Sequence, residues 1–192
     1  TLEQQLRESL DKVRMMENMT ILARAKVSES RDTRPGQHLE RIREYCRILA
    51  TELSGTPPYR EIITPLYIRT LCQGSLLHDI GKLRVADEIL DKPAKLDERE
   101  RKVMITHSFE TYHILRLIPG FEEIARWAAY HHEEPGGNGY PFRLPAETLD
   151  LEARILRVAD IFQAMAQDRP YRPGLSAQQV LEFMEDLVRQ GR

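Results

Sequence analysis

Apolar residues recur every three or four positions through most of the chain, and no stretch alternates apolar and polar residues as a half-buried strand does. This spacing predicts helices over residues 37–53, 97–117, 121–132, 149–166 and 177–188, and one that starts between residues 59 and 65 and runs to residue 78. Turn-forming residues separate them, most extensively over 133–145, and Ser176 is a suitable N-cap for the last helix. We therefore predict an all-α fold, with seven or so helices around one core.

The first thirty residues contain neither glycine nor proline and predict one further helix, polar and amphipathic. Leu6, Val13 and Met16 fall near a heptad seam, with charged residues between them. Such a helix suits a connector from an upstream module or an arm that forms a homodimer, and it equally suits an ordinary first helix packed on its own core. We predict a connector helix and turn over residues 1–34 and one helical domain over residues 35–192.

The composition is that of a cytoplasmic globular protein. Of 192 residues, 41% are hydrophobic and 30% charged, and the formal net charge of -2 gives no electrostatic case for binding a nucleic-acid polymer or a membrane surface. No apolar run approaches the ~20 residues of a membrane span. Cys46 and Cys72 lack the spacing of a zinc finger and fit a reduced compartment. The chain begins with Thr1, so we expect a piece of a longer protein.

The segment LLHDIGK (residues 76–82) ends a predicted helix with a histidine next to an aspartate. Adjacent side chains on a helix point about 100° apart, so His78 and Asp79 address one target only where the backbone turns. A left-handed cap at Gly81 would provide that turn, and the negative end of the helix dipole favours a cation. The alternative is a chance pair on a solvated helix end.

A second pair, His131-His132, also ends an apolar helix just before a glycine-rich loop. Asp160 adds a separate signal, because its helix is apolar on nearly all sides and a buried carboxylate must be neutralised, paired or bound to metal. A salt bridge to Arg154 or Arg157 is the alternative for Asp160, and the histidines favour metal over it.

This set of histidines and carboxylates exceeds what one tetrahedral zinc needs. It suits two octahedral ions that share a bridging carboxylate, with iron or manganese the expected metals. Two such ions would activate a bridging hydroxide and neutralise a phosphodiester during an in-line displacement. Lys82 lies close enough in sequence to hold a phosphate oxygen or the hydroxide, although a solvated surface lysine is the alternative.

These motifs resemble the HD phosphohydrolase superfamily. HDIGK (78–82) followed by DEILDKP (87–93) is similar to its core, and HHE (131–133) with Gly139, Tyr140 and Pro141 resembles the HD-GYP branch. Further blocks at family spacing are GQHLER (36–41), RILRVAD (154–160) and DRPYR (168–172). The resemblance covers residues 23–188, nearly the whole chain.

The resemblance implies an all-α, metal-dependent phosphodiesterase that hydrolyses the bacterial second messenger cyclic di-GMP to pGpG, and often on to GMP. It also implies roles for individual residues. The metal ligands would be His38, His78, Asp79, His107, His131, His132 and Asp160, with Asp79 bridging. Lys82 would contact the hydroxide or phosphate, and Arg169 and Arg172 the nucleotide phosphates, as forked guanidinium groups do. Tyr140 would shape the pocket mouth or a partner surface, and His113 matches no ligand position.

Two positions depart from the family pattern. Members with three metals carry a glutamate four residues before the first histidine, where this chain has Arg34, so we predict a binuclear site. Gly136 stands where members usually have an aspartate in the signature loop, which removes no ligand.

We therefore expect the output domain of a signalling protein whose upstream sensor or receiver module lies outside this chain. Two alternatives remain: a cyclic di-GMP receptor with weak or no activity, and an HD hydrolase of another nucleotide.

Overall fold

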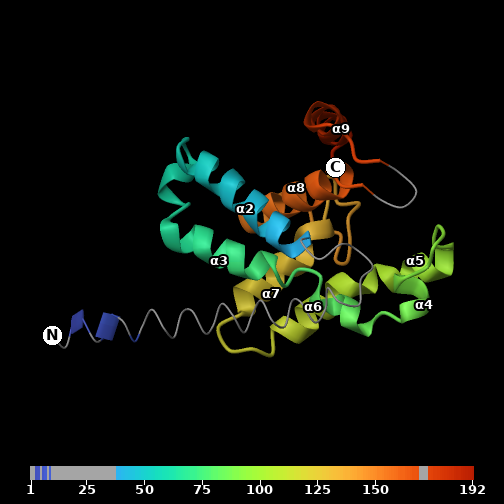
Figure 1. Cartoon of the computed structure of the whole chain (residues 1–192), viewed down its shortest axis with the longest axis horizontal. Helices are drawn as coiled ribbons and strands as arrows, with labels where there is room; N and C mark the ends of the chain where they lie inside the picture. The colour runs from blue at the N-terminus through green and yellow to red at the C-terminus, as the bar shows by residue number, and fades with distance from the viewer. Residues whose placement is uncertain (1–2, 5, 8, 10–37, 169–172) are drawn as a thin grey trace.

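A computed structural model describes residues 3, 4, 6, 7, 9, 38–168 and 173–192, and within them it contains helices and no strand (Figure 1). The α-helices are α2 (His38–Ser54), α3 (Pro65–Ser75), α4 (Asp87–Leu90), α5 (Glu98–Met104), α6 (Thr106–Leu115), α7 (Glu122–Ala129), α8 (Leu151–Ala166) and α9 (Ala177–Arg189). Short 3-10 helices are η1 (Tyr59–Glu61), η2 (Ile80–Arg84), η3 (Tyr130–His132) and η4 (Ala146–Thr148). The predicted all-α class is confirmed.

The apolar faces of the helices meet in one core. In Figure 1, α2 lies between α3 and α8, and it packs against both. Burial of apolar side chains from each helix is the main force that holds this arrangement. The core side chains include Ile42 and Cys46 on α2, Leu71 on α3, Leu115 on α6, Trp127 on α7 and Leu156 on α8.

Most predicted helix boundaries are met within a few residues, and the differences have local causes. The predicted helix over 97–117 is split at Ile105, where the side chains of Thr106 and His107 bond the carbonyls of Val103 and Met104. Side chains that take up such carbonyls compete with the next helical turn. The helix predicted to start between residues 59 and 65 begins at Pro65, with Thr64 as its N-cap, and it ends at Ser75, before the predicted end at residue 78.

The signature loop is irregular, as predicted. Residues 133–145 contain one isolated bridge, between Gly136 and Pro145, and no helix. The segment after Lys82 contains only the short helix α4. Ser176 caps α9 as predicted and forms a capping box with Gln179.

Packing between α3 and α7 brings the two predicted ligand pairs together. A Cβ at Gly74 would overlap the ring of Trp127, so the two helices touch at this point. Each contact residue lies one helical turn before a histidine, His78 after α3 and His131 after α7. The rings of these two histidines consequently lie 4.9 Å apart between centroids.

Three predictions fall wholly or largely outside the described residues: the helix over 1–30, Arg34, and the phosphate-binding pair Arg169 and Arg172. Of the first helix, the structure describes residues 3, 4, 6, 7 and 9, which are helical. The domain boundary at residue 35 stays a prediction. Within the described part of the chain, no helix is both long and apolar enough to cross a membrane.

Candidate metal centre

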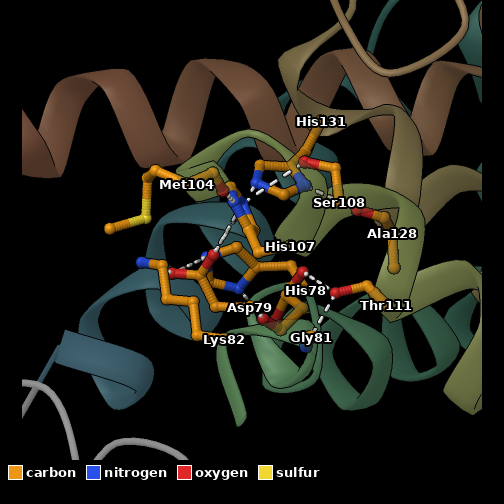
Figure 2. Close-up of polar contacts among 11 residues, drawn as sticks. His78, Asp79, Gly81, Lys82, Met104, His107, Ser108, Thr111, Ala128 and His131 are labelled. Atoms are coloured by element: carbon orange, nitrogen blue, oxygen red, sulfur yellow. Dashed lines mark hydrogen bonds and ion pairs between the residues drawn. The ribbon is translucent and has the colours of Figure 1, made fainter. Parts of the chain in front are cut away.

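Two groups of three potential metal ligands lie in the middle of the helical bundle, each with its ligand atoms within 4.8 Å of one another. We call them the first triad (His38, His78 and Asp79) and the second triad (His107, His131 and His132). The residues come from the start of α2, the turn after α3, the start of α6, and η3. Figure 2 shows His78, Asp79, His107 and His131 directed toward a common point. Six of the seven predicted ligands are thus brought together.

Three of the histidines are oriented by the same device. Nδ1 of His78, His107 and His131 lies 2.7, 2.8 and 2.6 Å from the backbone carbonyl three residues earlier. A carbonyl oxygen only accepts, so each Nδ1 carries the proton and Nε2 keeps its lone pair. Hydrogen bonds of this kind on the far ring nitrogen are typical of metal-bound histidines.

The Asp79 carboxylate lies between the histidines of the two triads. Its Oδ2 is 3.4 Å from Nε2 of His78, and its Oδ1 is 3.3 Å from Nε2 of His107 and 4.0 Å from Nε2 of His131. One oxygen therefore faces the first triad and the other faces the second. Nζ of Lys82 lies 2.5 Å from Oδ2, so a cation also borders the carboxylate.

Burial and charge set the protonation states of the metal-free centre. Burial lowers the pKa of His131 to about 3, with a further contribution from the neighbouring His78. Burial also lowers the pKa of His132 and of His107. For Asp79, burial favours the neutral acid, but Lys82 and the nearby histidines outweigh it and hold the pKa well below its usual range. The neutral imidazoles of the second triad beside an ionised carboxylate form a donor set ready for a divalent cation, whereas the Asp79 charge raises the pKa of His78.

The buried ring nitrogens show that these residues fit a metal ion. Nε2 of His78 and Nε2 of His131 are buried and have no hydrogen-bond partner among the described residues. An unsatisfied buried polar atom is unfavourable by about 1–3 kcal/mol, so such atoms normally have a ligand. Since both carry a lone pair toward the same point as Asp79, a metal ion would satisfy them together.

Asp160, the seventh predicted ligand, is half-buried on α8 and belongs to neither triad. The alternative interpretation, a salt bridge to arginine on its own helix, is not what the structure shows. Arg157 pairs with Glu134 at 3.3 Å, and Arg154 donates to the carbonyls of Ala146 and Leu149. Burial favours the neutral form of Asp160, but charge on His78 and His131 outweighs it and lowers the pKa of this carboxyl. Asp160 is therefore close enough to His78 and His131 for their charges to lower its pKa.

The signature loop folds over the second triad. Gly139 packs on the backbone of Glu133 and Glu134, where any Cβ would overlap, and this contact brings Tyr140 over His132. The two rings stack, with centroids 4.7 Å apart and planes 29° from parallel. Tyr140 thus lies on the His132 side of the centre, and the Tyr140-Pro141 peptide bond is cis.

Glu133 holds this loop from inside, a role that the sequence analysis did not assign. Its fully buried carboxylate accepts hydrogen bonds from the backbone N–H groups of Phe142, Arg143 and Leu144 at 2.6, 3.1 and 3.0 Å. The carboxylate at the end of the HHE motif thus fixes the segment that follows Tyr140. The position of Glu133, directly after the second histidine pair, was the only signal for it in the sequence.

The predicted left-handed cap at Gly81 is wrong. Gly81 lies in η2 and is not among the glycines with positive φ. Its missing side chain serves close packing instead, because a Cβ there would overlap the carbonyl oxygen of His107 and lie 2.6 Å from the backbone nitrogen of Thr111. His113 belongs to neither triad, and its ring packs against Phe109 with centroids 4.5 Å apart.

Comparison with known proteins identifies a family and several relatives that this chain resembles. A model of the HD domain family matches residues 25–192. The chain is 39% identical over 156 residues to 3'3'-cGAMP-specific phosphodiesterase 1 of Vibrio cholerae, a match covering 81% of this chain and 34% of that protein. It is 34% identical over 178 residues to a cyclic di-GMP phosphodiesterase of the same organism, covering 89% and 36%.

A third relative is the cyclic di-GMP phosphodiesterase response regulator RpfG of Xanthomonas campestris pv. campestris. The identity is 33% over 186 residues, covering 96% of this chain and 47% of that protein. The chain thus spans between a third and a half of the length of these relatives. With the family model matched over most of its length and the HD motif at the meeting point of the two triads, the chain belongs to the HD domain family.

Proposed function

We propose that this chain is an HD-GYP phosphodiesterase domain that hydrolyses cyclic di-GMP at a centre of two divalent metal ions, iron or manganese. The observation that carries the proposal is the Asp79 carboxylate, with one oxygen beside His78 of the first triad and the other beside His107 of the second. Two sets of donors separated by a shared carboxylate are the arrangement that two octahedral ions require.

The proposed ligands form two groups, one for each metal ion. His38, His78 and Asp79 would hold one ion, and the three histidines of the second triad would hold the other, with Asp79 shared. Asp160 would complete the centre from α8, since its carboxyl responds to the charge of His78 and His131. When bound, the two ions supply an activated water and neutralise a phosphodiester.

The remaining residues would bind and orient the substrate. Lys82, whose ammonium group is close to Asp79, would contact a non-bridging phosphate oxygen of the substrate. Tyr140 would limit access from the side of His132, where its ring already lies. Arg169 and Arg172, outside the described residues, would bind the nucleotide phosphates.

The substrate class rests on the relatives. Proteins named as cyclic di-GMP phosphodiesterases match this chain over 89% and 96% of its length. A relative of comparable similarity is named as specific for 3'3'-cGAMP, which makes this second cyclic dinucleotide an alternative substrate. Both molecules present the same phosphodiester ring to the metal centre and differ in one base.

The test is direct. Purified protein, loaded anaerobically with Fe²⁺ or with Mn²⁺, is incubated with cyclic di-GMP and in parallel with 3'3'-cGAMP, and the products are separated. We expect pGpG or GMP from cyclic di-GMP, and neither product with Asp79→Ala. Tight binding without turnover of either substrate would identify a receptor instead, and faster cleavage of 3'3'-cGAMP would reverse the substrate assignment.

A domain with this activity would act in the cytoplasm, where a bacterial second messenger is found. We also propose that an upstream sensor or receiver module regulates this activity, and that the first helix forms a dimer.

A further inference from the structure

A buried threonine on α6 connects the two halves of the candidate metal centre. The hydroxyl of Thr111 accepts a hydrogen bond from the backbone N–H of Gly81 at 3.0 Å and donates one to the backbone carbonyl of His78 at 2.9 Å. The residue is fully buried. Figure 2 shows Thr111 spanning these two backbone groups, which flank Asp79 on either side.

These two backbone groups are three residues apart, the spacing of a 3-10 hydrogen bond, and each bonds the Thr111 hydroxyl in place of the other. His78 lies in the turn between α3 and η2, where the helical ladder of α3 has ended. A hydroxyl is the smallest side-chain group that can both accept from one backbone group and donate to another. Thr111 thus satisfies a donor and an acceptor of the turn and also holds them apart, since without the hydroxyl they could close on each other.

The contact between η2 and α6 leaves no room for the turn to adjust. A side chain at Gly81 would overlap the carbonyl oxygen of His107, so the backbone of η2 lies directly on α6. His107 and Thr111 are one helical turn apart and lie on the same face of α6. The HD turn is therefore held against the helix that carries His107 by the Gly81 packing and the Thr111 hydroxyl together.

The position of Asp79 depends on this connection. Its carboxylate must remain 3.4 Å from His78 and 3.3 Å from His107, and these two histidines belong to separate segments. His78 and Asp79 move together with the turn, so a shift of the turn relative to α6 by a fraction of an ångström would change the distance from Asp79 to His107. The two hydrogen bonds of Thr111 join the segments on either side of that carboxylate.

We propose that Thr111 is a positioning residue for the metal centre, whose hydroxyl sets the separation between the HD turn and His107 and so places the shared carboxylate of Asp79. The inference rests on the two-metal centre proposed above. It assigns to Thr111 a role beyond packing, although the side chain touches neither the metal ions nor the substrate.

The experiment compares substitutions that separate the hydroxyl from the shape of the side chain. Thr111→Val keeps the shape and removes the hydroxyl, whereas Thr111→Ser keeps the hydroxyl and removes a methyl group. Leu115→Val is the packing control, because Leu115 lies one turn further along α6 and is fully buried in the core. Mn²⁺ is titrated into each metal-free protein by calorimetry, and the Tm of each metal-free protein is recorded.

We expect Thr111→Val to weaken Mn²⁺ binding about tenfold or more, the scale on which residues behind metal ligands act. Thr111→Ser should bind Mn²⁺ as the wild type does. Leu115→Val should lower the Tm and leave Mn²⁺ affinity unchanged. If Thr111→Val does not fold, Thr111→Ala takes its place with the same expectation.

Three results would overturn the inference. Wild-type Mn²⁺ affinity in Thr111→Val would show that the hydroxyl positions nothing. Equal weakening in Thr111→Val, Thr111→Ser and Leu115→Val would show a packing role only. A wild-type protein that binds no Mn²⁺ contradicts the proposed metal centre itself, and this result is distinct from the other two, which require that the wild type binds.

Discussion

Oδ1 of Asp79 lies 3.3 Å from Nε2 of His107, although Asp79 follows α3 and His107 begins α6. A neutral histidine whose Nδ1 is bonded to the Met104 carbonyl has only a lone pair to offer at Nε2. Two acceptors this close repel each other unless a proton or a cation lies between them. The pair is therefore poised for a metal ion, and the first prediction follows from it.

Asp79→Asn should remove metal binding and activity together. The amide keeps the size of the side chain but loses the charge and one of the two oxygens that face the triads. We expect metal content to fall and turnover of cyclic di-GMP to drop by more than about 100-fold, the upper range for residues that act behind the ligands. Elemental analysis and product formation measure the two effects. The exposed Asp91, changed to asparagine, is the matched control, and equal metal content in both variants would contradict the role of Asp79.

The metal-free protein should lose stability as the pH falls below neutral. The pKa of His131 is about 3 in the folded chain against 6.5 for an ordinary histidine, so between these values the unfolded state binds more protons. The free energy of unfolding therefore falls as the pH is lowered through this window. His107 and His132, whose pKa values are also lowered, act in the same direction.

His78 acts in the opposite direction. Burial disfavours its charged form, but Asp79 outweighs burial and raises the pKa of His78, so its contribution to stability is lost as the pH rises. Because three histidines have a lowered pKa and one has a raised pKa, we predict a net loss of stability at acid pH. Urea unfolding in the presence of a chelator, at about pH 7.5 and about pH 5, measures the difference. His131→Gln should reduce the slope, and a metal-free wild type that is more stable at the lower pH would refute the prediction.

Glu133→Gln should loosen the signature loop. The carboxylate accepts three backbone hydrogen bonds, and an amide nitrogen in place of Oε2 would face the N–H of Leu144. One unsatisfied buried donor is unfavourable by about 1–3 kcal/mol. We expect faster hydrogen exchange at the amides of Phe142, Arg143 and Leu144, and a higher KM because Tyr140 loses its support. Glu147→Gln, on an exposed side chain in the following η4, should change neither quantity.

Gly81→Ala should separate η2 from α6. Any Cβ there meets the backbone of His107 and Thr111, which cannot move aside as a flexible side chain would. Overpacking of this kind typically destabilises by about 1–3 kcal/mol. We expect a lower Tm and weaker metal binding. Gly55→Ala is the control, since its Cβ would lie 3.3 Å from the carbonyl oxygen of Glu52, far from either triad in the sequence; a similar loss of metal binding in both variants would rule out the proposed packing role.

The sequence predicted those parts of the site that lie where regular helices end. His78-Asp79 and His131-His132 could be identified because an apolar period stops just before each pair, and the helix boundaries followed from the same period. The last helix, for example, was expected over 177–188 and is observed over Ala177–Arg189. His38 and His107 were identified as candidates through the family resemblance, and the structure places both within the triads.

Other features depend on contacts between segments, which no local pattern contains. The role of Thr111 exists only because η2 lies on α6, and a threonine within a helical pattern has no signal for it. Gly81 was misread for the same reason, since a glycine after a helix more often forms a left-handed cap than a close contact. The break at Ile105 arises from two side chains that bond backbone carbonyls, an effect that helical periodicity does not report.

The number and position of bound ions test the central claim most directly. Crystals of the protein loaded with Mn²⁺, measured for anomalous scattering and paired with elemental analysis of the same sample, would locate and count them. We predict two ions per chain, one at His38 and His78 and the other at His107, His131 and His132, with the Asp79 carboxylate between them. A single ion, or ions at which Asp79 is not a shared ligand, would contradict it, and a third ion would overturn the argument drawn from Arg34.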